Sequence, residues 1–157
     1  MTNIPITEIH SGLALLPDKM NSPEAIALMI AIGLQESRFN HRKQIGGPAN
    51  GYWQFESCGG VRGVMTHHSS RSHARSVCEK LGVEWSQNII YNAIVDNDKL
   101  AACFARLLLW TDANPMPAIG ESDKAWDYYI RNWRPGKPHP ETWSELYQQA
   151  VEFVREN

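Results

Sequence analysis

Apolar residues recur at helical spacing along most of the chain, and one segment between residues 22 and 39 is apolar on every face. Ser22, Pro23 and Glu24 mark its start, because serine caps helices well, proline suits the first helical position and a carboxylate complements the helix dipole. The residues that follow, 25–32, are all apolar. Such a helix is normally buried, and this one is shorter than the roughly 20 residues of a membrane span. We therefore predict a buried central helix over residues 22–39.

The remaining pattern predicts further helices packed around this one. The predicted segments are residues 6–16, 63–67, 87–95, 98–110, 122–133 and 141–156, together with one that begins at Ser70 or Ser72 and ends at Gly82. Residues 40–60 are predicted to form a Gly-rich loop, although Tyr52, Trp53 and Phe55 favour its folding back onto the protein. No alternating pattern predicts a strand, and no linker or repeat divides the chain. We expect a mainly α single domain over residues 1–157, a bundle around the central helix.

Composition narrows the functional classes. The chain has 157 residues and a net charge of −2, and its Lys and Arg residues form no basic run. We therefore expect no nucleic-acid partner and no attraction to an anionic membrane surface. The shortness of the apolar segment predicts that no part of the chain is an integral membrane segment. The N-terminus lacks a basic stretch followed by an apolar one, so we expect synthesis in the cytoplasm without a signal peptide.

Cysteine and histidine do not predict a metal site. The three Cys residues are widely spaced, and no carboxylate or Cys spacing supports a metal at His67, His68 and His73. No Ser/His/Asp or Cys/His triad is indicated either. We expect reduced thiols, no cofactor and no metal.

Glu36 is the strongest candidate for chemistry. It falls in the last turn of the central helix, on the same stripe as Met29 and Ile32. Burial and the negative end of the helix dipole both disfavour an ionised carboxylate there, so both raise its pKa. A carboxyl group that keeps its proton is what a general acid needs, and glycoside cleavage is one reaction that uses such an acid. The alternative is a glutamate that turns to solvent at a frayed helix end.

Two motifs in register carry a resemblance to a known family. Residues 36–39 read Glu-Ser-Arg-Phe, and residues 51–54 read Gly-Tyr-Trp-Gln. They resemble the soluble lytic transglycosylases and goose-type lysozymes, in which Glu-Ser-x-Phe ends a helix and Gly-Leu-Met-Gln lies in a Gly-rich loop. A third family motif, Ala-Tyr-Asn-x-Gly, has its best counterpart at residues 125–130, where the Tyr role falls to Tyr129 or Tyr128 and Ile130 replaces the Asn.

The resemblance implies a lysozyme-like fold and an enzyme that cleaves peptidoglycan. Glu36 would protonate the β-1,4 bond between N-acetylmuramic acid and N-acetylglucosamine and then act as base, giving a 1,6-anhydro product. The implied substrate-binding residues are Ser37, Tyr52, Trp53, Gln54, Tyr128 and Tyr129. Glu56 is a candidate second carboxylate, which an inverting hydrolase would need.

The sequence leaves open the biological setting and three alternative functions. Residues 133–136, Trp-Arg-Pro-Gly, are similar to small bacteriophage cell-wall lysins, which implies a monomer that acts on periplasmic peptidoglycan after release through a holin or delivery in the virion. The alternatives are a muramidase, a chitinase-like glycosidase, and a non-catalytic glycan-binding or virion structural protein.

Overall fold

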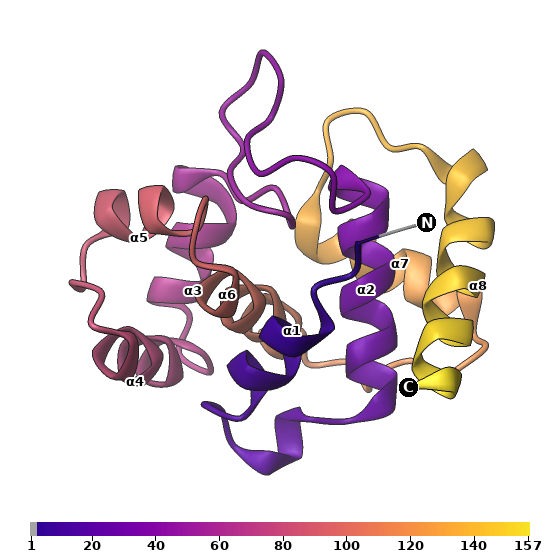
Figure 1. Ribbon diagram of the computed structural model, residues 1–157, viewed down its shortest axis with the longest axis horizontal. Helices are drawn as coiled ribbons and strands as arrows, with labels where there is room; N and C mark the ends of the chain where they lie inside the picture. Colours follow the sequence, from indigo (N-terminus) through magenta and orange to yellow (C-terminus); the bar gives the residue numbers. More distant parts are fainter. Residues whose placement is uncertain (1–2) are drawn as a thin grey trace.

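Helices and the turns between them account for the fold of residues 3–157, the part of the chain that the computed structural model describes (Figure 1). Within these residues there are eight α-helices and no strand, so the mainly α single domain is confirmed. The helices are α1 (Ile6–Leu13), α2 (Pro23–Ser37), α3 (Arg62–Thr66), α4 (Arg71–Leu81), α5 (Gln87–Ala93), α6 (Asp98–Trp110), α7 (Ser122–Trp133) and α8 (Pro140–Glu156). A 3₁₀ turn, η1 (Asp18–Met20), precedes α2, and a wide turn, η2 (Ser57–Val61), precedes α3. None of the helices in residues 3–157 is both long and apolar enough to cross a membrane.

Helix α2 is the predicted central helix. The Ser22 side chain caps it by accepting a hydrogen bond of 3.1 Å from the amide of Ala25, and residues 25–34 are all buried. The helix ends at Ser37 because Arg38 adopts a left-handed conformation with φ 56°. It is therefore slightly shorter than the predicted segment of residues 22–39.

Helix α6 is a second buried helix, which the sequence analysis did not predict as such. Asn97 caps it by accepting a hydrogen bond from the amide of Leu100, and residues 100–109 are all buried. Its apolar stripe accounts for only part of this burial. Small alanines such as Ala102 and Ala105 complete it, because they let neighbouring helices approach the other faces closely. The core is thus built on two buried helices rather than one.

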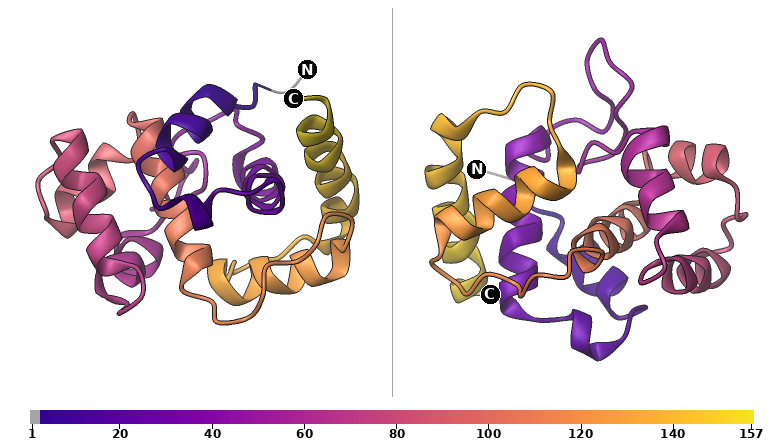
Figure 2. Two further views of the ribbon diagram at one scale, coloured as in Figure 1. Left: turned by 90° about the horizontal axis from the view of Figure 1, so that it is seen from below. Right: turned by 180° about the vertical axis from the view of Figure 1, so that it is seen from behind.

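The other helices gather on either side of this pair. Helices α3, α4 and α5 lie beyond α6 at one end of the molecule, and α7 and α8 lie at the opposite end beside α2 (Figures 1 and 2). Helix α2 packs chiefly against α8, and α6 packs chiefly against α1. The loop of residues 41–50 and the α7–α8 connection both rise near the end of α2, where Glu36 lies (Figure 1).

Candidate functional site

The carboxyl group of Glu36 is held at the end of α2. It is half-buried, and the hydroxyl of Tyr129 donates a hydrogen bond to its Oε2. Burial raises the pKa of Glu36 above the ordinary value of 4.5, and the bond from Tyr129 opposes that rise. The direction of the predicted pKa shift is therefore confirmed, and Glu36 is not a solvated glutamate at a frayed end.

Aromatic neighbours fix the position of Tyr129. Its side chain is 2 % exposed, and its ring stacks on that of Trp143 at 5.2 Å between centroids with an angle of 2° between the planes. The rings of Trp126 and Trp133 lie 5.5 Å and 6.2 Å away. Burial and the negative charge of Glu36 raise the pKa of Tyr129, so its hydroxyl keeps its proton and remains a donor.

Tyr128, the alternative to Tyr129, points in a direction about 100° away from it around α7. It is 3 % exposed, and its hydroxyl lies 3.2 Å from the carbonyl oxygens of both Leu109 and Asn114. The structure therefore corrects the expectation that Tyr128 binds substrate, because its polar end is used within the core.

Ser37 fastens the loop to the helix end. Its hydroxyl donates to the carbonyl of Tyr52 at 2.6 Å and accepts from the amide of Phe39 at 3.1 Å. Phe39 folds back over Gly33, where an added Cβ would meet the ring at 2.1 Å. Ser37 is itself buried, so its role is to position the loop rather than to contact a ligand.

Two aromatic residues of the second motif do not line the site. Trp53 is 1 % exposed, and its indole N–H donates to the carbonyl of Met29 at 2.8 Å. Tyr52 packs edge-on against Phe39 and lies under the guanidinium of Arg42, at 4.5 Å from its ring centre. Their prediction as sugar-contacting residues is corrected, because burial of these rings against α2 and Arg42 stabilises the loop more than exposure on its surface.

A cleft of about 720 Å³ opens beside Glu36. Of the predicted residues it brings together Glu36, Gln54, Glu56 and Tyr129. Its two walls come from the loop of residues 41–49 and from the α7–α8 connection, residues 134–139. A second hollow of about 540 Å³ shares Glu56, Trp133 and Arg134 with it, so the two adjoin as one elongated groove.

Backbone strain concentrates around this groove. Among residues 3–157, the only non-glycine residues with positive φ are Arg38, Phe39, Gln54 and Arg134. Two of them, Gln54 and Arg134, line the cleft, and the other two form the turn that follows Glu36. A left-handed conformation costs a non-glycine residue roughly 1–2 kcal/mol, and such residues cluster at functional sites.

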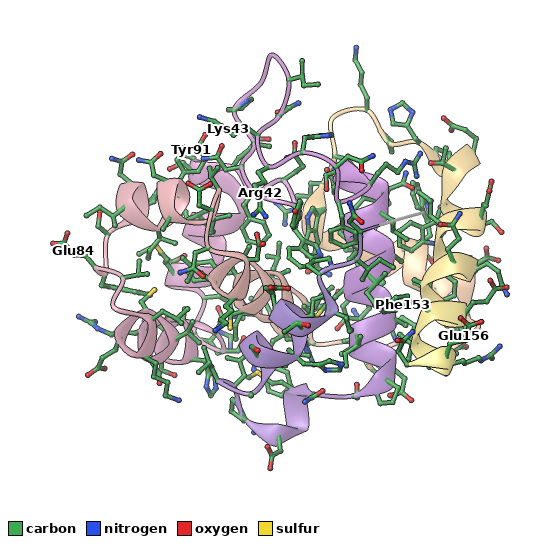
Figure 3. The ribbon with its side chains drawn as sticks, viewed as in Figure 1. Arg42, Lys43, Glu84, Tyr91, Phe153 and Glu156 are labelled. Atoms are coloured by element: carbon green, nitrogen blue, oxygen red, sulfur yellow. The ribbon has the colours of Figure 1, made fainter. Side chains whose placement is uncertain are left out.

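The loop wall is anchored at its base. Arg42 pairs with Asp98 at the start of α6, and the hydroxyl of Tyr91 donates to the carbonyl of Pro48. Figure 3 shows Arg42, Lys43 and Tyr91 together where the loop leaves the body of the protein. The tip reaches further into solvent, and Ile45 there is 89 % exposed.

Several cleft residues were missed by the sequence analysis. They are Gln35, His41, Gln44, Arg134, Lys137 and His139. One signal was present, because the Arg-Pro-Gly-Lys-Pro-His segment of residues 134–139 separates two predicted helices immediately after the third motif. A polar loop in that position borders whatever site the motif contributes to.

Residues 3–157 offer no candidate metal site. No group of three His, Cys, Asp or Glu side chains within residues 3–157 is arranged to hold a metal ion. The rings of His67 and His68 stack on each other at 4.4 Å.

No protein-family model, curated protein or solved structure matches this chain.

Proposed function

We propose that this protein is a peptidoglycan lytic transglycosylase with a lysozyme-like fold. It would cleave the β-1,4 bond between N-acetylmuramic acid and N-acetylglucosamine. The observation that carries the proposal is the Glu36 carboxyl group, half-buried with a raised pKa, bonded by Tyr129 and facing an elongated cleft. The proposed setting is a bacteriophage enzyme that acts on the periplasmic wall, with peptidoglycan strands as its partner.

The chemistry needs one group that both gives and takes a proton. Glu36 gives its proton to the glycosidic oxygen as the bond to C1 of the muramoyl residue breaks. The resulting carboxylate, which keeps the hydrogen bond from Tyr129, then takes the proton of the muramoyl C6 hydroxyl. The C6 oxygen bonds to C1, which gives the 1,6-anhydro end and returns Glu36 to its protonated form.

The shape of the groove supports a polymeric substrate. A single sugar unit would need only the hollow beside Glu36, whereas the groove continues past Glu56 and Trp133 into the second hollow. Both Gln54 and Arg134 line the cleft in left-handed conformations, which agrees with a site whose geometry is maintained at a cost in stability.

A hydrolase is the second candidate, and Glu56 favours it. Its exposed side chain lines the same cleft as Glu36 and has no ion-pair partner within residues 3–157. An inverting hydrolase uses a second carboxylate to activate water. Products distinguish the two reactions, because a transglycosylase leaves anhydro ends and a hydrolase leaves reducing ends.

The test compares Glu36→Gln with the wild-type protein on purified peptidoglycan and on cells stripped of their outer membrane. Glu79→Gln, on the exposed face of α4, is the control for loss of one negative charge. We expect lysis and anhydro-muropeptides from the wild type and the control, and a loss of at least a hundredfold for Glu36→Gln. A folded Glu36→Gln protein with undiminished lysis would refute the proposal, as would turnover of chitooligosaccharides alone or wall binding without cleavage.

A further inference from the structure

Two cations of the cleft form no ion pair within the part of the chain that the structure describes. Arg134 and Lys137 both line the hollow beside Glu36, and both side chains are exposed. Neither forms an ion pair with an acidic side chain of residues 3–157. The net charge of the chain is −2, so a basic composition does not account for their presence together.

The segment that carries these cations is tied to the site at both ends. At one end, the indole N–H of Trp133 donates to the carbonyl of Trp53 at 2.8 Å. At the other, the side-chain amide of Gln35 donates to the carbonyl of His139 at 2.9 Å, and the hydroxyl of Thr142 lies 3.0 Å from its Oε1. Gln35 directly precedes Glu36, so residues 134–139 have a fixed position relative to the acid.

Two cations held in a fixed position relative to the catalytic acid indicate an anionic group on the substrate. The N-acetylated sugars of the glycan chain are neutral where the lactyl carboxyl group of the muramoyl residue is amide-linked to its peptide. The anionic groups of peptidoglycan are the carboxylates of the stem peptide, which branches from the lactyl group of each muramoyl residue. A carboxylate is a good partner for the guanidinium of Arg134 and for the ammonium of Lys137.

We propose that Arg134 and Lys137 bind a stem-peptide carboxylate next to the scissile bond and thereby make peptide-bearing strands the preferred substrate. The inference rests on the proposed function for its substrate. It predicts that the protein distinguishes strands by the charge of the peptide and not only by the sugars.

The experiment uses three forms of one glycan preparation. They are strands with intact peptides, the same strands with the peptide carboxyl groups converted to amides, and strands stripped of peptides by an amidase, with the lactyl carboxyl groups that this exposes also converted to amides. The test variant is Arg134→Gln/Lys137→Gln, and the charge-conserving variant is Arg134→Lys/Lys137→Arg. The control is Arg71→Gln/Lys99→Gln, which removes the same charge from exposed positions outside the cleft.

We expect the test variant to lose about fivefold in kcat/KM on peptide-bearing strands, a size typical of two exposed ion pairs. It should lose less than about twofold on amidated or stripped strands, and the control should stay close to the wild type on all three. The charge-conserving variant should recover most of the loss, and added salt should narrow the preference. Equal losses on all three substrates, or a control that behaves as the test variant does, would overturn the inference while leaving the proposed function standing.

A binding measurement separates the two proposals. Anisotropy of the same strands, labelled with a fluorophore, is measured with Glu36→Gln in place of the wild type, so cleavage does not intervene. Tighter binding of peptide-bearing than of amidated strands, lost when Arg134 and Lys137 are also replaced by Gln, supports the cation pair even if no variant cleaves the wall. Equal affinity for both kinds of strand overturns it.

Discussion

Removal of the Tyr129 hydroxyl tests the central contact of the site. Tyr129→Phe keeps the ring on Trp143 and removes only the donor to Glu36. That bond contributes about 1 kcal/mol while Glu36 is protonated and about 1.5–3 kcal/mol once it is ionised. The Tyr129 bond lowers the pKa of Glu36, so removal of the bond raises that pKa further. The destabilisation caused by Tyr129→Phe therefore increases as the pH rises through the pKa of Glu36. The destabilisation should therefore grow by about 1 kcal/mol from acid to alkaline pH, which is about 2–4 °C in Tm for a chain of this size.

The assay is urea unfolding of both proteins below pH 4.5, the ordinary pKa of a glutamate, and at mildly alkaline pH. Tyr128→Phe is the matched control, because its hydroxyl donates to backbone carbonyls and its loss should cost about 1 kcal/mol at either pH. A loss for Tyr129→Phe that is the same at both pH values, or larger in acid, would show that the hydroxyl does not bind an ionised Glu36.

Three further changes test the helix end around the acid. Glu36→Gln should be more stable than the wild type at neutral and alkaline pH and should lose that advantage below pH 4.5. The reason is that a raised carboxyl pKa lowers the stability of the wild type only as the pH rises, and thermal melts of both proteins across this range measure the difference. Gly33→Ala should destabilise by about 1–3 kcal/mol in urea, because its methyl group would overlap the ring of Phe39, whereas Gly63→Ala faces open space on α3 and should not. Ser37→Ala should cost about 1–3 kcal/mol in the same assay, since it leaves a loop carbonyl without its donor.

The predictable part of the fold is the part that local chemistry decides. Ser22 caps α2 and Gly82 ends α4 with a left-handed φ of 67°, both as predicted, and Asn97 caps α6 through a side chain of the kind that suits an N-cap. Glu36 is singled out by its place at the end of an apolar helix together with the two family-like motifs, because the helix alone leaves open a glutamate that turns to solvent.

The positions of the aromatic residues required tertiary structure. Tyr128 and Tyr129 are adjacent on α7 and point in directions about 100° apart. Both directions are buried, since Tyr128 meets the end of α6 and Tyr129 meets Trp143 of α8. The helical pattern shows two buried sides but not which of them holds the site. Trp53 illustrates the same limit, because its N–H is satisfied by a carbonyl of α2 that is 24 residues away in the chain.

The cleft contains both an acid that must keep its proton and two cations, Arg134 and Lys137. A cation close to Glu36 would favour the ionised form and lower its pKa, which would remove the proton that the reaction needs. Burial raises the pKa of Glu36 and the Tyr129 bond opposes that rise, and neither Arg134 nor Lys137 forms an ion pair with Glu36. The two cations therefore line the same hollow as Glu36 without the direct ion pair that would favour its ionised form.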